Sequence, residues 1–299
     1  MKAAILRQGS MVVEDIPELT PGPGQVLVQT IACGICGSDL HTVDHAHHMA
    51  DTAVEAGIPT FNFDPDADLV MGHEMSVEVL ETGSGVDGVD PGMTMAAMPM
   101  LNTPAGLEVP GYSNRYPGGY CERMLLDPAA LVPIPNGLAP HMAALTEPMA
   151  VGLHAVNQSS VTQGRAAIVV GAGPVGLAVI SALRLAGAEP IIATDLSPSR
   201  RALARTMGAH IVIDPGTADT RQAGFALATE ALSAETGRGP DADPPIIFEA
   251  VGVPGMIDMA MTGAPSGSEV VVAGVCMEHD QFRPIMGIYK RLTVRFVLG

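Results

Sequence analysis

The chain has 299 residues, 47% of them hydrophobic, which is enough to fill two hydrophobic cores. Its 15 lysines and arginines are outnumbered by 32 aspartates and glutamates, and no basic cluster is present that could contact phosphates. Nucleic acid and anionic membranes are therefore excluded as expected partners. The N-terminal apolar run is too short for a signal peptide, and no stretch approaches the roughly 18 apolar residues of a membrane span. We expect a cytoplasmic protein.

Four cysteines limit the covalent and metal chemistry. Cys33 and Cys36 form a CxxC pair, whereas Cys121 and Cys276 are isolated. This spacing supports neither a disulfide framework nor a zinc lobe with four cysteines. We expect the thiols to stay reduced.

Up to about residue 135 the sequence predicts short strands separated by turns rich in glycine and proline. The expected strands are Lys2–Leu6, Met11–Glu14, Gln25–Ala32, Met75–Glu81, Met93–Ala97 and Tyr120–Leu126. A helical segment is expected between Ala139 and Gln158. This pattern indicates a β-rich domain over residues 1–155.

Beyond this boundary, strands alternate with helices. The expected elements are the strand Ala166–Val170, the helix Pro174–Ala186, the strand Ile191–Thr194, the helix Ser199–Met207 and the strands Ile211–Ile213, Ile246–Phe248, Glu269–Ala273 and Arg291–Leu298. Strands alternating with helices form a doubly wound parallel sheet, so we expect an α/β domain over residues 156–299.

A glycine-rich turn connects the first strand and helix of the second domain. Its residues are Gly171, Ala172, Gly173, Pro174, Val175 and Gly176, and they follow an apolar strand directly, as in dinucleotide-binding domains. Asp195 ends the next strand, where a carboxylate accepts the ribose hydroxyls of NAD and repels the 2′-phosphate of NADP. Arg200 and Arg201 favour NADP if they face the ribose, and otherwise lie on a helix surface. The sequence favours NAD; a Rossmann-like domain with an empty crevice is the alternative.

Potential metal ligands occur in the first domain. Cys36, Asp39 and His41 lie in one short segment, and His73 and Glu74 are adjacent. Thiolate, imidazole and carboxylate are the groups that bind zinc. Taken singly, each has an ordinary explanation as a buried small residue, a core histidine or a solvated carboxylate.

Six segments together resemble the zinc-dependent medium-chain dehydrogenase/reductase family. They are Gly34–His41, Gly72–Glu74, Gly118–Tyr120, Thr146–Pro148, Gly171–Gly176 and Phe248–Gly252. The resemblance covers nearly the whole chain. It implies a β-rich GroES-like catalytic domain followed by a Rossmann NAD-binding domain, and it adds Val251 to the expected cofactor-binding residues.

The resemblance also implies roles for the candidate residues. Cys36 and His73 are expected to bind one catalytic zinc ion, Asp39 to orient His73, and either Glu74 or Glu147 to complete the shell, as in the polyol, threonine and glucose dehydrogenase branch. The clustered cysteines of a structural zinc site are missing, so one zinc per chain is expected.

Ser38 and His41 are expected to relay the proton of the alcohol. Their alternatives are a helix cap and a surface histidine.

These expectations describe a dehydrogenase that oxidises a secondary alcohol or polyol with NAD and forms a homodimer or homotetramer. The alternatives are a catalytically silent nucleotide-binding relative and a zinc-free NADPH-dependent quinone or enone reductase. Family members continue for several tens of residues beyond the position of Gly299, so the resemblance implies a C-terminal truncation. We expect impaired activity or solubility from residues 1–299 alone.

Overall fold

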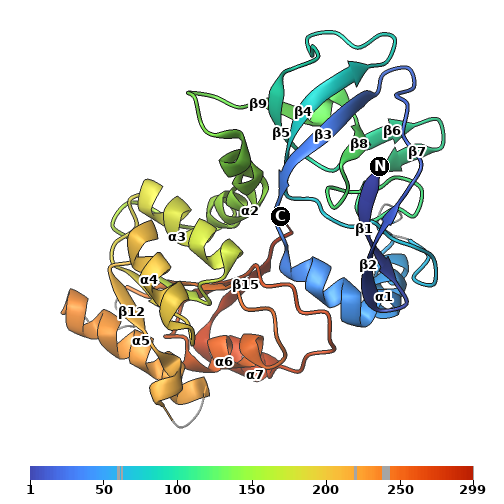
Figure 1. Cartoon of the computed structure of the whole chain (residues 1–299). Coiled ribbons are helices and arrows are strands. Elements are labelled where there is room, and N and C mark those ends of the chain that lie inside the picture. Colours follow the sequence, from blue (N-terminus) through green and yellow to red (C-terminus); the bar gives the residue numbers. More distant parts are fainter. Residues whose placement is uncertain (59–60, 62, 219–220, 238–242, 299) are drawn as a thin grey trace. The chain divides into compact units, whose positions relative to one another are not determined.

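The computed structural model describes residues 1–58, 61, 63–218, 221–237 and 243–298 (Figure 1). The chain divides into two units, Met1–Glu147 and Pro148–Gly299. The predicted boundary near residue 155 lies inside helix α2, Thr146–Asn157. No helix in the described ranges is both long and apolar enough to span a bilayer.

The first unit is built around a five-stranded antiparallel sheet with the strand order β8-β3-β4-β5-β9. Its strands are β3 (Val26–Cys33), β4 (Met75–Thr82), β5 (Thr94–Ala97), β8 (Arg123–Leu126) and β9 (Leu131–Pro133). Alternate residues such as Val26, Val28 and Val77 point into one core, while Leu27 belongs to a second cluster. The β-rich domain that the sequence predicts is thus confirmed.

Two hairpins accompany this sheet. They are β1 (Lys2–Arg7) with β2 (Ser10–Asp15), and β6 (Leu101–Thr103) with β7 (Gly106–Glu108). The sequence predicted β1 and β2, but not β6, β7 or β9. Those three strands have three residues each, too few to show an alternating pattern.

Helix α1 (Gly37–Glu55) is a further element that the sequence did not predict. It is polar and rich in histidine, it is kinked at His45, and its buried positions are Asp39, Thr42, Ala50 and Ala53. So sparse an apolar face gives a weak helical signal. Short 3₁₀ segments complete the unit at Pro128–Ala130 and Pro140–Leu145.

The second unit contains a six-stranded parallel sheet with the order β12-β11-β10-β13-β14-β15. Its strands are β10 (Ala167–Val170), β11 (Ile191–Thr194), β12 (Ile211–Ile213), β13 (Ile246–Glu249), β14 (Glu269–Val272) and β15 (Thr293–Phe296). The five strands and two helices that the sequence predicts between Ala166 and Ala273 are all present, and so is the predicted terminal strand. The doubly wound Rossmann fold is confirmed.

Helices cover both faces of this sheet (Figure 1). They are α3 (Pro174–Leu185), α4 (Pro198–Met207), α5 (Arg221–Thr236), α6 (Met256–Gly263) and α7 (Pro284–Lys290), with a 3₁₀ turn at Pro215–Thr217. Val169 and Phe248 pack with α3 and α4, while Ile168 and Ile247 pack with α5 and α6. Because β10 and β13 are neighbours whose following helices lie on opposite faces, a crevice for a ligand is expected at their carboxyl ends.

Candidate functional site

Three predicted metal ligands meet in the first unit. Cys36 directly precedes α1, and His73 and Glu74 directly precede β4. One ligand atom of each residue lies within 4.8 Å of those of the other two. His73 and Glu74 are buried and Cys36 is half-buried. The structure thus forms a thiolate, imidazole and carboxylate cluster from residues that are far apart in the sequence.

The carboxylate of Asp39 lies next to the imidazole ring of His73. Its Oδ2 atom accepts hydrogen bonds from the backbone N–H of Cys36 at 2.9 Å and from the hydroxyl of Tyr120 at 2.7 Å. Its Oδ1 atom lies 3.5 Å from Nδ1 of His73. With Nδ1 turned toward the carboxylate, Nε2 is the nitrogen left to bind a metal.

The charges in this cluster are strongly coupled. Burial disfavours the charged form of Asp39, but His73 and Tyr120 hold the pKa of its carboxyl below the usual value. Burial likewise works against a charged His73, yet Asp39 and Cys36 raise the pKa of this histidine to about 10. In the metal-free cluster His73 is therefore protonated. A bound metal cation would displace a proton from this histidine and supply positive charge in its place.

The residues present fit a zinc ion. Nδ1 of His73 and Oδ1 of Asp39 are buried without a hydrogen-bond partner in the described structure, although they face each other. A carboxylate facing the distal nitrogen of a histidine is typical of metal sites. The donor set of one thiolate, one imidazole and one carboxylate suits zinc.

Glu147 lies at the edge of this cluster. Burial raises the pKa of its carboxyl, which also interacts electrostatically with His73, Glu74 and Asp39. It does not belong to the three-residue group that meets within 4.8 Å.

Burial also raises the pKa of the Glu74 carboxyl. A cation bound nearby would lower this pKa again, because it favours the charged carboxylate.

Close backbone packing fixes the loop that carries His73. Gly72 has a φ of +97°, and Gly111 and Gly118 pack against its carbonyl oxygen. A Cβ atom on Gly111 would lie 2.9 Å from this oxygen, and one on Gly118 would lie 2.5 Å from it. The Gly118–Tyr120 segment of the sequence analysis thus supports the ligand loop directly.

Ser38 is hydrogen-bonded to a residue for which the sequence suggested no role. Its hydroxyl lies 2.9 Å from that of Tyr112, which is buried and whose ring centroid is 5.3 Å from that of His73. Because 74 positions separate Ser38 from Tyr112, no local pattern could reveal the pair. His41 is half-buried one turn further along α1.

Cys33, the other cysteine of the CxxC pair, packs against Gly119. Burial raises the pKa of its thiol to about 12. Such a thiol stays protonated and is a poor nucleophile, which agrees with a packing role.

The glycine-rich turn of the second unit follows β10 and opens α3. Gly171 has a φ of +92°, and a Cβ atom there would lie 2.8 Å from Cγ2 of Val251. A Cβ atom on Gly176 would collide with the carbonyl oxygen of Gly171. A Cβ atom on Gly173 would meet nothing within 4 Å. The fold itself thus requires glycine at 171 and 176, whereas the open space at Gly173 suits the approach of a pyrophosphate.

Pro174 and Val175 form the first turn of α3. Proline lacks the N–H that the first helical position leaves unpaired, so it fits here. The unpaired N–H groups at the start of a helix favour a bound anion, so this turn suits a phosphate group.

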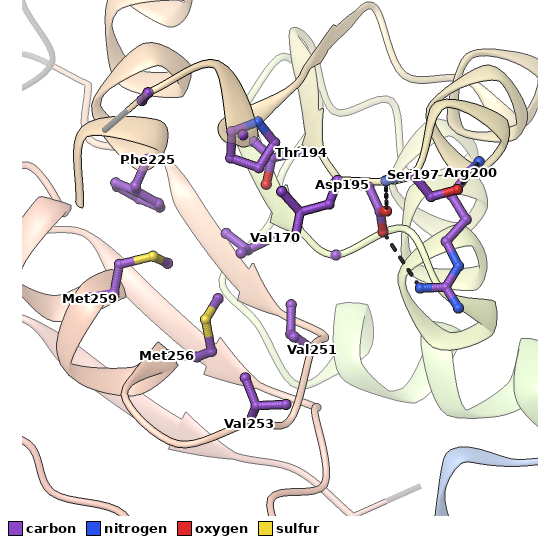
Figure 2. Close-up of a pocket in the computed structure, with 15 residues that line it drawn as sticks. Val170, Thr194, Asp195, Ser197, Arg200, Phe225, Val251, Val253, Met256 and Met259 are labelled. Carbon is purple, nitrogen blue, oxygen red and sulfur yellow. Dashed lines mark hydrogen bonds and ion pairs between the residues drawn. The ribbon is translucent and has the colours of Figure 1, made fainter. Parts of the chain in front are cut away.

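Asp195 lies at the end of β11 with both carboxylate oxygens engaged. Oδ2 accepts a hydrogen bond from the N–H of Ala172 at 2.8 Å, and Oδ1 accepts one from the N–H of Ser197 at 2.7 Å. Arg200 forms an ion pair with Oδ2 at 4.0 Å, and its side chain is 56% exposed (Figure 2). Arg201 instead pairs with Asp214 at 2.8 Å. Of the two arginines, Arg200 therefore faces the predicted ribose position.

A pocket of about 450 Å³ lies beside Asp195. Asp195, Ser197 and Arg200 form its polar side, and apolar side chains from other elements face them (Figure 2). The apolar part includes Val251, Val253, Phe225, Met256 and Met259. A polar rim next to an apolar cavity suits a ligand with a ribose and a flat aromatic base.

Comparison with known families and proteins agrees with both halves of this description. The chain matches the alcohol dehydrogenase GroES-like domain over residues 22–136 and the zinc-binding dehydrogenase domain over residues 174–299. (R,R)-butanediol dehydrogenase of Bacillus subtilis is 33% identical over 314 residues, covering 100% of this chain and 84% of the relative. Sorbitol dehydrogenase of Gallus gallus is 29% identical, covering 92% of this chain and 75% of the relative.

Solved structures show the same architecture. The crystal structure of 2R,3R-butanediol dehydrogenase from Bacillus subtilis has a TM-score of 0.77 at 32% identity and covers 100% of this chain and 84% of that one. A Sinorhizobium meliloti protein solved with NADP bound has a TM-score of 0.78 at 28% identity, covering 99% of this chain and 84% of that one. The chain belongs to the zinc-dependent medium-chain dehydrogenase family, whose members are alcohol dehydrogenase-type oxidoreductases.

Proposed function

We propose that this protein is a zinc-dependent dehydrogenase that transfers hydride between a secondary alcohol or polyol and NAD. The convergence of Cys36, His73 and Glu74 carries this proposal, since a zinc-type ligand cluster accompanies a dinucleotide-binding fold in one chain. The butanediol and sorbitol dehydrogenases among its relatives support a substrate with neighbouring hydroxyl groups.

In this proposal Cys36, His73 and Glu74 hold one zinc ion. When bound, zinc supplies a Lewis acid that lowers the pKa of a coordinated hydroxyl. Asp39 keeps the His73 ring in place, and the Cys36 N–H and Tyr120 hydroxyl fix Asp39 in turn. Glu147 is the candidate for exchange with Glu74, because its half-buried carboxyl interacts electrostatically with His73, Glu74 and Asp39.

Ser38 and His41 are proposed to move the proton of the alcohol. Ser38 lies in the first turn of α1, two residues after Cys36, and His41 follows three residues later, so the two share a helix face. A serine hydroxyl accepts one proton while releasing its own, and an imidazole accepts the proton at neutral pH.

The proposed cofactor preference rests on Asp195. Its carboxylate is fixed by two backbone N–H groups and is left with lone pairs that can accept ribose hydroxyls. A 2′-phosphate at this position would meet a negative charge that Arg200, at 4.0 Å and mostly exposed, offsets only in part. We therefore favour NAD, although a relative of known structure binds NADP.

Metal analysis combined with a substrate screen tests the proposal. We expect one zinc per chain and zinc-dependent formation of NADH from 2,3-butanediol or sorbitol. Cys36→Ser should lose zinc and activity, whereas the matched control Cys276→Ser, which lies in the second unit, should keep both. NADH binding without turnover by the zinc-loaded protein would instead support a silent nucleotide-binding relative. Full turnover after verified removal of zinc would refute a zinc-dependent mechanism.

A further inference from the structure

The hydroxyl groups of Ser38 and Tyr112 form a hydrogen bond beside the metal cluster. Their oxygen atoms are 2.9 Å apart, and the distance alone is compatible with either group as the donor. Tyr112 comes from a loop between β7 and β8 and is 5% exposed. The proposed function assigns no role to this tyrosine.

The position of Tyr112 is fixed relative to the metal ligands. Gly111, its neighbour in the chain, packs against the backbone of Gly72, which directly precedes His73. The Tyr112 ring also packs against His73, with centroids 5.3 Å apart, and against Phe61, with centroids 4.8 Å apart. The phenol is thereby held on Ser38 by the same packing that places the ligand loop.

The hydrogen-bonding capacity of Ser38 decides which group must donate. A serine hydroxyl has one proton and two lone pairs. If Ser38 relays a proton, one lone pair accepts the proton of the substrate hydroxyl while its own proton leaves toward His41. The remaining lone pair can only accept, so a neighbour on that side must be a donor. A neutral phenol meets this requirement.

We propose that Tyr112 is a positioning residue that donates its hydroxyl hydrogen to Ser38 and so keeps the Ser38 proton free for transfer. This inference rests on the proposed function. In the step, the substrate O–H bond breaks and a new O–H bond forms on Ser38, whose former proton moves to His41. The electron pair of the broken bond stays on the substrate oxygen, and Tyr112 keeps its own proton throughout.

A double-mutant cycle tests this role in the zinc-loaded protein. Tyr112→Phe removes the hydroxyl and keeps the ring that packs on His73 and Phe61. Ser38→Ala removes the residue through which Tyr112 is said to act. Tyr116→Phe is the matched control, because Tyr116 lies in the same loop and packs in a separate cluster with Leu27 and Leu101.

We expect Tyr112→Phe to lower kcat about three- to tenfold, the loss of one hydrogen bond, with KM and zinc content unchanged. In the Ser38→Ala background the same substitution should have no further effect, since residues that act through each other are not additive. Tyr116→Phe should match the wild type.

Unchanged kcat in Tyr112→Phe, or losses that add in the double variant, would refute the role of Tyr112 while leaving the dehydrogenase intact. Wild-type protein that holds zinc and NADH but oxidises no alcohol would refute the proposed function itself, and the relay with it.

Discussion

Two glycines in the dinucleotide turn should respond in opposite ways to the same substitution. Gly173 has ordinary backbone angles, φ −69° and ψ −175°, and a methyl group there meets no other atom within 4 Å. At Gly176 the methyl group collides with the carbonyl oxygen of Gly171. Gly173→Ala should therefore impair cofactor binding, and Gly176→Ala should impair folding.

The expected magnitudes follow from these surroundings. For Gly173→Ala, the smaller entropy of the unfolded chain stabilises by about 0.4–1 kcal/mol, and the poorer helix cap costs a similar amount. The free energy of unfolding should change by less than about 1 kcal/mol. The new methyl group occupies the space where the pyrophosphate approaches, so NADH affinity should fall at least about tenfold, or 1.4 kcal/mol. For Gly176→Ala, overpacking should destabilise the fold by about 1–3 kcal/mol.

Urea unfolding and NADH fluorescence titration measure the two effects separately. The reasoning would be wrong if Gly173→Ala bound NADH as tightly as the wild type, or if it unfolded as easily as Gly176→Ala. The pair also controls for general damage, because both variants add one methyl group to the same turn.

Four further predictions concern the metal cluster and the ribose site. Burial opposes a charged His73, but Asp39 and Cys36 raise its pKa to about 10, so a zinc ion that binds this histidine must displace a proton. Zinc affinity should therefore rise about tenfold per pH unit from pH 6.5 toward pH 10, as measured by competition with a chelator. A flat profile would contradict this. Since that pKa is raised on folding, His73 stabilises the metal-free protein fully below pH 6.5, and calorimetry should show this stability being lost as pH rises through about 10. Tyr120→Phe removes a hydrogen bond to Asp39 and should weaken zinc binding up to about tenfold, whereas unchanged zinc dissociation would show that Asp39 needs no such support. Asp195→Ser should raise the ratio of kcat/KM for NADP over NAD at least about tenfold, and an unchanged ratio would remove Asp195 from cofactor selection.

The second unit was predictable because its signals are local. Four-residue apolar strands such as Ala167–Val170 are buried on both faces, and the glycine turn follows directly in the sequence. Asp195 was also evident, since it ends the next strand. Its two hydrogen bonds to Ala172 and Ser197 were not, because they depend on side-chain geometry.

The first unit was harder to predict because its organisation depends on contacts between distant segments. Helix α1 has a mostly polar sequence with little helical periodicity, so the sequence did not predict it. Its first turn stood out only because Cys36, Asp39 and His41 are potential metal-site residues. The resemblance to the family predicts Cys36 and His73 as metal ligands and leaves Glu74 and Glu147 as alternatives for the third. The structure brings Glu74 into the three-residue group, and the choice of the third ligand stays a prediction. Tyr112 was missed because only the folded loop brings it to Ser38.

The packing of Gly72, Gly111 and Gly118 implies an order of events during folding. These three residues meet only when distant segments have been brought together, and closing such long loops costs chain entropy before any contact compensates for it. In the unfolded chain, Cys36 and the His73–Glu74 pair lie on distant segments, so the three-residue cluster does not yet exist. We therefore expect zinc to bind late in the folding of the first unit, after the loops that pack at Gly72, Gly111 and Gly118 have formed.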